Sequence, residues 1–385
     1  MYARDASETL TRLAQGFPVV TLTGPRQSGK TTLARAQFPL KPYVSLENPD
    51  ERDFAISDPR RFLARFPEGA ILDEIQRCPA LFSWLQGVVD ERQRMGEFIL
   101  TGSSQFDLMA GISQSLAGRV GRVELLPLSL PELRAAGCLP EHLDSLLLNG
   151  SYPAVYSRGL RPADWYGNYV STYLDRDVRQ ILQVRDLALF QRFLKLCAAR
   201  SGQLLNLSSL GADCGITSVT ARQWMDVLEA SYLVVRLQPF HRNYGKRLVK
   251  TPKLYFLDTG LAAWLLGIRD IETLSLHPSR GALFETWVVQ ERMKASLNRG
   301  ESPRLSFWRD HVGNEVDLLE EKGHTLTPTE IKSGATFASD WSLGINRFSL
   351  LAGPDLATPR ILYGGDSSFE REGYRVLGWR DLDAS

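Results

Sequence analysis

A short stretch near the N-terminus places the strongest constraint on how this chain can fold. It has the spacing G-x-x-x-x-G-K-[ST], follows an apolar run at 18–23 that predicts a buried strand, and precedes a segment at 33–36 that predicts a helix start. In this strand–loop–helix context the spacing predicts a polyphosphate site, because the loop N–H groups and the helix N-terminus face the anion. The alternative is an ordinary glycine-containing turn before a helix. The residues expected to bind are Gly24, Pro25, Arg26, Gln27, Ser28, Gly29, Lys30, Thr31 and Thr32.

Two of these side chains have specific roles in such a loop. Lys30 would reach the β- and γ-phosphates, and the Thr31 hydroxyl would bind Mg²⁺. The partner that this loop needs is an apolar strand that ends in acids, and the run AILDEIQ at 70–76 supplies one. Asp73 would hold Mg²⁺, largely through water, and Glu74 would polarise the water that attacks the γ-phosphate. The alternative is an exposed acidic strand end.

Two further places in the first 130 residues are candidates for contact with the γ-phosphate. The strand 98–101 is followed by Gly-Ser-Ser-Gln, where Ser104 is the favoured contact; alternatively these residues form a turn with a helix cap. A fifth strand is expected from Val123, with Arg119 and Arg122 just before it. Either arginine would stabilise transition-state charge, often in a neighbouring subunit, although a surface arginine is an equal alternative.

Bulk composition bounds the remaining possibilities. The chain has 385 residues, 43% hydrophobic and 23% charged, which is typical of two or three globular domains. A net charge of +1 gives no global field for nucleic acid or membrane, so any such binding comes from local patches. No apolar run is long enough to span a bilayer, and the first residues lack an apolar signal core. Four scattered cysteines indicate neither a zinc site nor a disulfide framework, so a reducing cytoplasm is expected.

Taken together, the loop, LDEIQ at 72–76 and TGSS at 101–104 resemble an AAA-type P-loop ATPase. More specifically, the chain resembles a large prokaryotic family of such ATPases that carry a C-terminal domain of unknown function. The segments that fit are YVSLENPDERDFAISDP, ILDEIQRCP, LTGSSQF, LAGRVGRVELLPLSLPE, NGSYPAV, RLVKTPKLYFLDTGLAAWLLG and GALFETWVV. The resemblance covers nearly the whole chain. It implies ATP binding and hydrolysis but no physiological role.

The middle of the chain is expected to contain two helical domains. Residues 131–184 have the place of the small helical lid that follows an AAA core, and residues 185–270 resemble a winged helix. The expected wing at 241–253 is basic with one tyrosine and no acid, which suits a DNA backbone; a winged helix used only for protein contacts is the alternative. The candidate DNA contacts are Arg222, Arg242, Lys246, Arg247 and Lys250.

The last segment, 271–385, predicts a helix, three strands, a helix and a strand, an order that resembles the PD-(D/E)xK nuclease-like fold. Asp317 on the second strand and Glu330 on the third would share Mg²⁺. Lys332, two residues after Glu330, would face the same side of the sheet and activate water, and Glu285 on the first helix would support the site. No proline precedes the acid, since the sequence is Asn314-Glu315-Val316-Asp317. The alternative is a retained fold that only binds.

The expected architecture is therefore α/β: a P-loop NTPase parallel sheet at 1–130, a helical lid, a winged helix and a PD-(D/E)xK nuclease-like α/β domain. The leading hypothesis is a homo-oligomeric, Mg²⁺-dependent ATPase that remodels or translocates DNA, with a C-terminal domain that holds or cuts it. ATP, Mg²⁺ and DNA are the expected ligands, without a membrane. The alternative is a nucleotide-dependent switch or regulator without nuclease activity.

Overall fold

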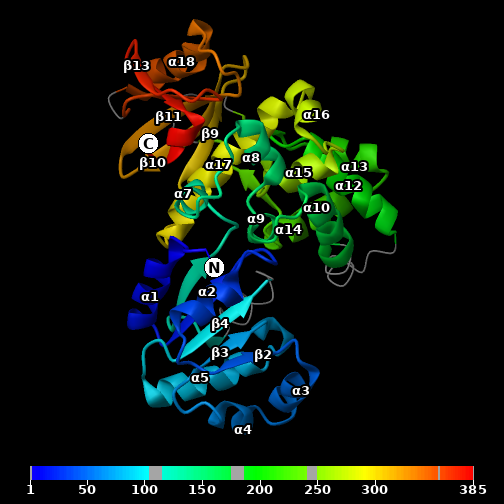
Figure 1. Cartoon of the computed structure of the whole chain (residues 1–385), viewed down its shortest axis with the longest axis vertical. Coiled ribbons are helices and arrows are strands. Elements are labelled where there is room, and N and C mark those ends of the chain that lie inside the picture. The colour runs from blue at the N-terminus through cyan, green and yellow to red at the C-terminus, as the bar shows by residue number, and fades with distance from the viewer. Residues whose placement is uncertain (1, 104–114, 175–185, 241–248, 354–355, 385) are drawn as a thin grey trace. The chain divides into compact units, whose positions relative to one another are not determined.

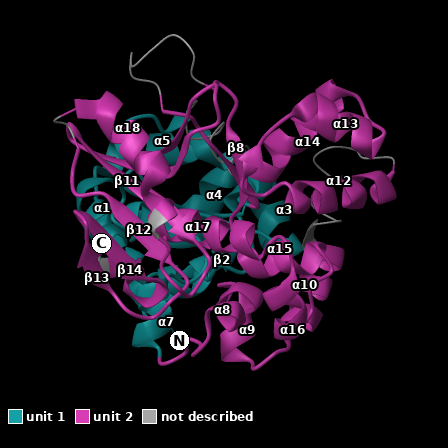
Figure 2. Cartoon of the chain, turned by 90° about the horizontal axis from the view of Figure 1, so that it is seen from above, with its two compact units in different colours: residues 1–136, 230–232, 294–302 teal, residues 137–229, 233–293, 303–385 magenta. Residues whose placement is uncertain are grey.

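The computed structural model describes residues 2–103, 115–174, 186–240, 249–353 and 356–384 (Figure 1). The chain divides into two compact units (Figure 2). Unit 1 comprises 1–136, 230–232 and 294–302, and unit 2 comprises 137–229, 233–293 and 303–385. Among the described residues, no helix is both long and apolar enough to cross a membrane.

Unit 1 is built on a parallel sheet of order β2-β3-β4-β1-β5. Its strands are β1 (Val19–Thr23), β2 (Tyr43–Ser45), β3 (Ala70–Asp73), β4 (Phe98–Gly102) and β5 (Val120–Glu124). Its helices are α1 (Ala6–Gly16), α2 (Lys30–Gln37), α3 (Pro49–Ser57), α4 (Pro59–Ala64), the 3₁₀ turn η1 (Ile75–Arg77), α5 (Leu81–Arg92) and α7 (Leu130–Ala135). The parallel sheet confirms the α/β class expected from alternating strand and helix signals.

Helices cover both faces of this sheet, which explains why its inner strands are continuous apolar runs. One core cluster joins the sheet to α3, α4 and α5, and a second joins it to α1 and α2 (Figure 1). The strands β1, β3 and β4 are buried along their whole length. Because β4 pairs with β1 on one side and β3 on the other, the carboxyl ends of all three meet at one edge.

The predicted start of the fifth strand was wrong. β5 begins at Val120 rather than Val123, so Arg122 lies within the strand and only Arg119 precedes it. The strand has alternating burial, with Gly121 and Val123 buried and Arg122 exposed. An edge strand with one exposed face has this period of two, which an expectation based on a continuous apolar run misses.

Unit 2 begins with helices where a lid was expected. These are α8 (Leu143–Asn149), α9 (Pro153–Ser157), α10 (Pro162–Tyr169) and the π-helical turn η2 (Val170–Leu174). A second group follows: α12 (Leu187–Ala199), β6 (Gln203–Leu204), α13 (Leu207–Cys214), α14 (Ser218–Ala230), β7 (Val234–Leu237) and β8 (Lys253–Phe256). The three strands form an antiparallel sheet of order β6-β8-β7. Gly215, at φ 81°, ends α13 in the left-handed conformation and allows the tight turn into α14.

The C-terminal part contains a six-stranded sheet of order β13-β14-β12-β11-β10-β9. Helices α15 (Thr259–Leu265), α16 (Ile271–Leu276) and α17 (Arg280–Asn298) precede it. The strands are β9 (Leu305–Arg309), β10 (Glu315–Lys322), β11 (Thr325–Lys332), β12 (Arg360–Tyr363), β13 (Phe369–Arg371) and β14 (Tyr374–Gly378), with 3₁₀ turns η3 (Ser339–Ser342) and η5 (Trp379–Ala384). The helix α18 (Leu343–Ala352) connects the parallel pair β11 and β12 and packs on the sheet.

Hydrogen bonds cross the expected domain boundaries inside unit 2. The Phe240 N–H donates to the Phe307 carbonyl at 2.7 Å, which joins the end of the β7 strand to β9. The Arg280 guanidinium contacts the Asp144 carboxylate at 2.8 Å and the Ser333 carbonyl at 2.7 Å. These bonds hold the helical, three-stranded and six-stranded parts together as one unit.

Candidate functional site

The loop after β1 owes its shape to backbone conformations that glycine makes accessible. Gly24 has φ 147°, and a Cβ atom there would lie 2.2 Å from the carbonyl oxygen of Leu125. Gly29 has φ 97° and directly precedes α2. Gln27 adopts φ 61° without being glycine, a strained state of the kind that accumulates at functional sites. The chain at 24–32 therefore curls in front of the α2 N-terminus, as a phosphate-binding loop requires.

Lys30 is buried and folded back onto its own loop. Its ammonium donates hydrogen bonds to the carbonyl oxygens of Gly24 at 2.9 Å and Pro25 at 2.7 Å. Burial lowers the pKa of Lys30 to about 8, although the carboxylates of Glu74 and Asp73 act in the opposite direction. The cation is thus held at the centre of the loop by two neutral acceptors that a phosphate can replace.

Asp73 at the end of β3 is the acceptor for three hydroxyl groups. Thr31 donates to Oδ1 at 3.0 Å, Thr101 on β4 donates to the same oxygen, and Tyr43 on β2 donates to Oδ2 at 2.7 Å. Burial and the hydrogen bond to Asp73 raise the pKa of Tyr43 to about 12. The expected pair of Thr31 and Asp73 is therefore brought together. The sequence reasoning missed Tyr43 and Thr101; Thr101 lies near the carboxyl end of β4, whereas Tyr43 begins the three-residue strand β2 and reaches Asp73 with its long side chain.

Glu74 is the first residue after β3 and has φ 56°, ψ 44°. Its Oε2 accepts hydrogen bonds from Ser103 Oγ at 3.1 Å and from the Gln76 amide. Left-handed backbone is costly for a glutamate, so two side-chain contacts here indicate a position that the fold holds in place. The expected contact Ser104 lies outside the described residues; its neighbour Ser103 is the serine that reaches Glu74.

Arg4 was missed altogether, and it supports the loop from behind. Its guanidinium donates to the Ser28 carbonyl at 2.7 Å and the Leu126 carbonyl at 2.6 Å, and pairs with Glu132 at 3.0 Å. Both charged side chains are at most 5% exposed. No sequence pattern marks an arginine for this role, because its partners lie 24 to 128 residues away along the chain.

The two candidate arginines have different surroundings. Arg119 forms a two-point ion pair with Asp90, with N–O distances of 2.5 and 2.9 Å. Arg122 is exposed on β5, where its charge interacts with Glu124. Arg26 of the loop lies 3.7 Å from Glu47. Arg119 and Arg122 thus both interact with acidic residues of the same chain.

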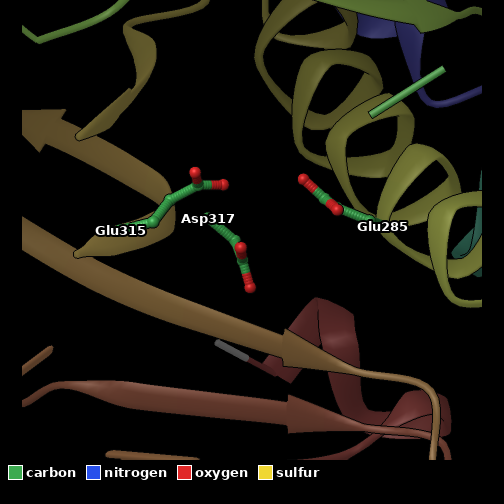
Figure 3. A group of neighbouring side chains, drawn as sticks. All are labelled: Glu285, Glu315 and Asp317. Carbon is green, nitrogen blue, oxygen red and sulfur yellow. The ribbon is translucent and has the colours of Figure 1, made fainter. Parts of the chain in front are cut away.

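A second group of functional side chains lies in unit 2. Glu285 of α17 and Glu315 and Asp317 of β10 have carboxylate oxygens within 4.8 Å of one another, and Figure 3 shows the helix residue opposite the two strand residues. Glu315 was not among the predicted ligands. The signal was present, because residues two apart on a strand share a face.

Glu330 and Lys332 of β11 adjoin Asp317, as expected. The Lys332 ammonium contacts Glu330 Oε1 and lies 3.9 Å from Asp317 Oδ2, which also accepts a 2.8 Å hydrogen bond from the Ile331 N–H. Burial, followed by the charge of Asp317, raises the pKa of Glu330. Burial also raises the pKa of Glu285, against the opposing charge of Lys253.

The donor set of this group fits a divalent cation. Carboxylate oxygens are the ligands of hard ions such as Mg²⁺. Oε2 of Glu330 is buried and accepts no hydrogen bond within the described parts of the chain, so it remains open to a ligand. The residues therefore fit a metal, with Glu285, Glu315 and Asp317 closest together and Glu330 beside them.

The expected DNA contacts are only partly visible. Arg222 lies exposed on α14, next to exposed Gln223, and Lys250 is exposed just before β8. The other three candidates, Arg242, Lys246 and Arg247, lie outside the described residues.

Comparison with protein families agrees with the loop and sheet. A family model described as an AAA domain matches residues 16–134. Two models described as domains of unknown function match residues 140–272 (DUF8612) and 280–382 (DUF4143). With the loop, the acids after β3 and the five-stranded parallel sheet, the AAA match defines the class of the protein: a P-loop ATPase of the AAA type.

Two relatives that match nearly the whole chain identify the family. The uncharacterized protein Rv2008c of Mycobacterium tuberculosis is 34% identical over 370 residues, which is 95% of this chain and 81% of that protein. The uncharacterized protein Mb2031c of Mycobacterium bovis gives the same figures. The chain belongs to the family of these two mycobacterial proteins.

More distant likenesses appear among solved structures. The Walker-type ATPase PABY2304 of Pyrococcus abyssi is 16% identical with a TM-score of 0.47, over 69% of this chain and 96% of that chain. DnaA of Aquifex aeolicus, solved with AMPPCP, is 14% identical with a TM-score of 0.31, over 58% and 85%.

Proposed function

We propose that this chain binds Mg²⁺-ATP at Gly24–Thr32 and hydrolyses it. The observation that carries the proposal is the meeting of Lys30, Thr31, Asp73 and Glu74 at one edge of the sheet. In the nucleotide complex Lys30 leaves the two loop carbonyls and binds the β- and γ-phosphates. Thr31 and Asp73 hold Mg²⁺, which neutralises charge on the phosphates.

Glu74 serves as the general base in this proposal. It accepts a proton from the attacking water, while Ser103 and Gln76 fix the orientation of its carboxylate. Arg119 or Arg122 of a neighbouring subunit in a homo-oligomer would stabilise the transition-state charge. Ser104, Arg119, the remaining loop residues Pro25 to Ser28, and Thr32 stay as candidates for contact with the nucleotide.

The test is ATP turnover in Lys30→Ala, with Lys41→Ala as a matched control, because Lys41 lies outside the loop and bonds the backbone carbonyls of Glu68 and Glu97, which precede β3 and β4. We expect Lys30→Ala to abolish hydrolysis and Lys41→Ala to retain it. Unchanged turnover in a folded Lys30→Ala protein would refute the ATPase assignment.

We further propose that the ATPase acts on DNA through unit 2. The order α12, β6, α13, α14, β7, β8 and the sheet order β6-β8-β7 support a winged helix at 185–270. Exposed Arg222 and Lys250, with the basic segment 241–248, provide cations for the phosphate backbone. DNA binding should weaken with rising salt, and Arg222→Ala and Lys250→Ala should each lower affinity for all sequences alike.

The C-terminal carboxylates are proposed as a second Mg²⁺ site of a nuclease-like domain. The helix and strand order α17, β9, β10, β11, α18, β12 and the proximity of Asp317, Glu330 and Lys332 support it. Cleavage of a panel of linear, branched and single-stranded DNAs, lost in Asp317→Ala, is the test. Absence of cleavage for every form would leave a binding domain only.

The second candidate is a nucleotide-dependent switch without nuclease activity. The low exposure of the C-terminal carboxylates, 13–19% for Glu285, Glu315 and Asp317, favours it, because a phosphodiester needs an open cleft. Turnover measured with and without DNA separates the two: strong stimulation indicates a motor, whereas slow turnover indifferent to DNA indicates a switch.

A further inference from the structure

A lysine from the three-stranded sheet enters the group of C-terminal carboxylates. Lys253, the first residue of β8, is 2% exposed. Its ammonium lies 2.9 Å from Glu285 Oε1 and also contacts Glu315 Oε1. These are two of the three residues whose carboxylates converge within 4.8 Å. A buried cation already links α17 and β10 at the place where a divalent ion would bind.

Two aromatic side chains stabilise the contact between this cation and Glu285. Tyr255, two residues along β8, donates its hydroxyl to Glu285 Oε1, the oxygen that also contacts Lys253. The Phe307 ring of β9 lies 5.4 Å from the ammonium, a distance at which the ring face attracts a cation. The ammonium contacts two carboxylates and a ring, and its side chain is buried. Lys253 is therefore an ordered residue of the site.

We infer that Lys253 is the internal cation of the Glu285–Glu315–Asp317 group, and that a divalent ion binds there only in competition with it. This inference rests on the proposed assignment of these carboxylates to metal binding, but not on DNA cleavage. A residue of the segment 185–270 thereby controls the metal occupancy of the segment 271–385.

Electrostatics gives the reason for competition. A divalent ion takes carboxylate oxygens at about 2.0–2.6 Å, and Lys253 already occupies carboxylates of the same group. The two cations would lie a few ångströms apart in a buried place, where repulsion is poorly screened. A metal can therefore take the oxygens of Glu285 and Glu315 only when the Lys253 ammonium moves away from them.

The experiment measures Mn²⁺ binding to the full chain without nucleotide or DNA, by isothermal titration and by paramagnetic resonance of free Mn²⁺. The variants are Lys253→Met and Lys253→Met/Asp317→Asn. Lys322→Met is the matched control, because Lys322 is an exposed lysine at the far end of β10. We expect Lys253→Met to bind Mn²⁺ at least about tenfold more tightly than wild type, with Lys322→Met unchanged and the double variant returning to weak binding.

Stability supplies a second readout. Without metal, Lys253→Met leaves the largely enclosed carboxylates of Glu285 and Glu315 without their cation, so its melting temperature should fall. Added Mn²⁺ should restore it, and should raise the wild-type melting temperature much less. If Lys253→Met fails to fold, Lys253→Met/Glu330→Gln removes one negative charge with the positive one and keeps Glu285, Glu315 and Asp317 as ligands.

The outcomes distinguish the competition between Lys253 and the metal from the assignment of the carboxylates to metal binding. Equal Mn²⁺ affinity in wild type and a folded Lys253 variant, both abolished by Asp317→Asn, would overturn the competition and leave the metal site intact. No Mn²⁺ binding at Asp317 in any folded variant would overturn the competition together with the metal assignment.

Discussion

The Thr31 hydroxyl donates a 3.0 Å hydrogen bond to Oδ1 of Asp73, across 42 residues of sequence. Thr31 is the second residue of α2 and Asp73 is the last residue of β3, so the bond joins the start of the helix to a strand end. The same carboxylate takes Tyr43 on its other oxygen. Thr31 and Asp73 are therefore already in contact at the place proposed for Mg²⁺.

Removing the Thr31 hydroxyl tests this pair. Thr31→Ala should weaken Mg²⁺-dependent ATP binding by about 1–3 kcal/mol, since it removes an oxygen ligand and leaves Asp73 short of a donor. Thr31→Ser keeps the hydroxyl and should bind almost as wild type. Titration of a fluorescent ATP analogue with and without Mg²⁺ is the measurement. Loss of affinity that persists without Mg²⁺ would argue against a metal role for Thr31.

Glu74→Gln should separate binding from hydrolysis. The amide fits the same space but cannot accept a proton, so turnover should fall by about 10²–10⁴ while ATP affinity stays near wild type. Single-turnover hydrolysis and nucleotide titration measure the two quantities. A comparable loss of affinity would show instead that Glu74 shapes the loop.

The buried ion pair of Arg4 and Glu132 should contribute to the stability of unit 1. Arg4→Met breaks a buried ion pair and leaves Glu132 charged, which should cost about 3–5 kcal/mol of unfolding free energy. It should also weaken ATP binding, because the Ser28 carbonyl loses its donor. Denaturant titration measures the first effect. The control Arg12→Met removes an exposed hydrogen bond to the Arg299 carbonyl and should change stability little; an equal loss there would contradict the role of Arg4.

Glu124 on β5 should make the thermal stability depend on pH. Burial raises the pKa of Glu124 above its ordinary value, although the Tyr232 hydroxyl and the Arg122 charge act in the opposite direction. A raised folded-state pKa means that its contribution to stability is fully present below the unfolded pKa, near 4.5, and is lost as the pH rises through the folded pKa. Glu124→Gln should therefore match wild type near pH 4 and melt at a higher temperature than wild type near pH 8. Thermal scans across this range check it, and a constant difference would contradict it.

Much of the fold was accessible from the sequence because its signals are local. The strand–loop–helix at 18–36 and the apolar strand before Asp73 depend on neighbouring residues only, and both appear in unit 1. The strand Arg360–Tyr363 and the helix Ser218–Ala230 also have the expected bounds. The fifth strand was misplaced because its period of two differs from a continuous apolar run.

The residues of the candidate sites also divide into those that a local pattern predicts and those that it does not. The sequence by itself predicted the loop with Lys30 and Thr31 from one strand, one turn and one helix start, and predicted Asp73 and Glu74 from the acidic end of a separate apolar strand. It also located Asp317, Glu330 and Lys332 on two neighbouring strands. Backbone conformation and side-chain periodicity are properties of short segments, so a linear pattern is sufficient for them.

Only the tertiary structure decided which distant side chains complete each site. Tyr43 reaches Asp73 because β2 lies beside β3, and Arg4 reaches Ser28 by packing of the N-terminal segment. Lys253 meets Glu285 and Glu315 because β8 lies against α17 and β10. Such contacts depend on sheet order and on the burial of charge, which long-range packing sets and no local pattern records.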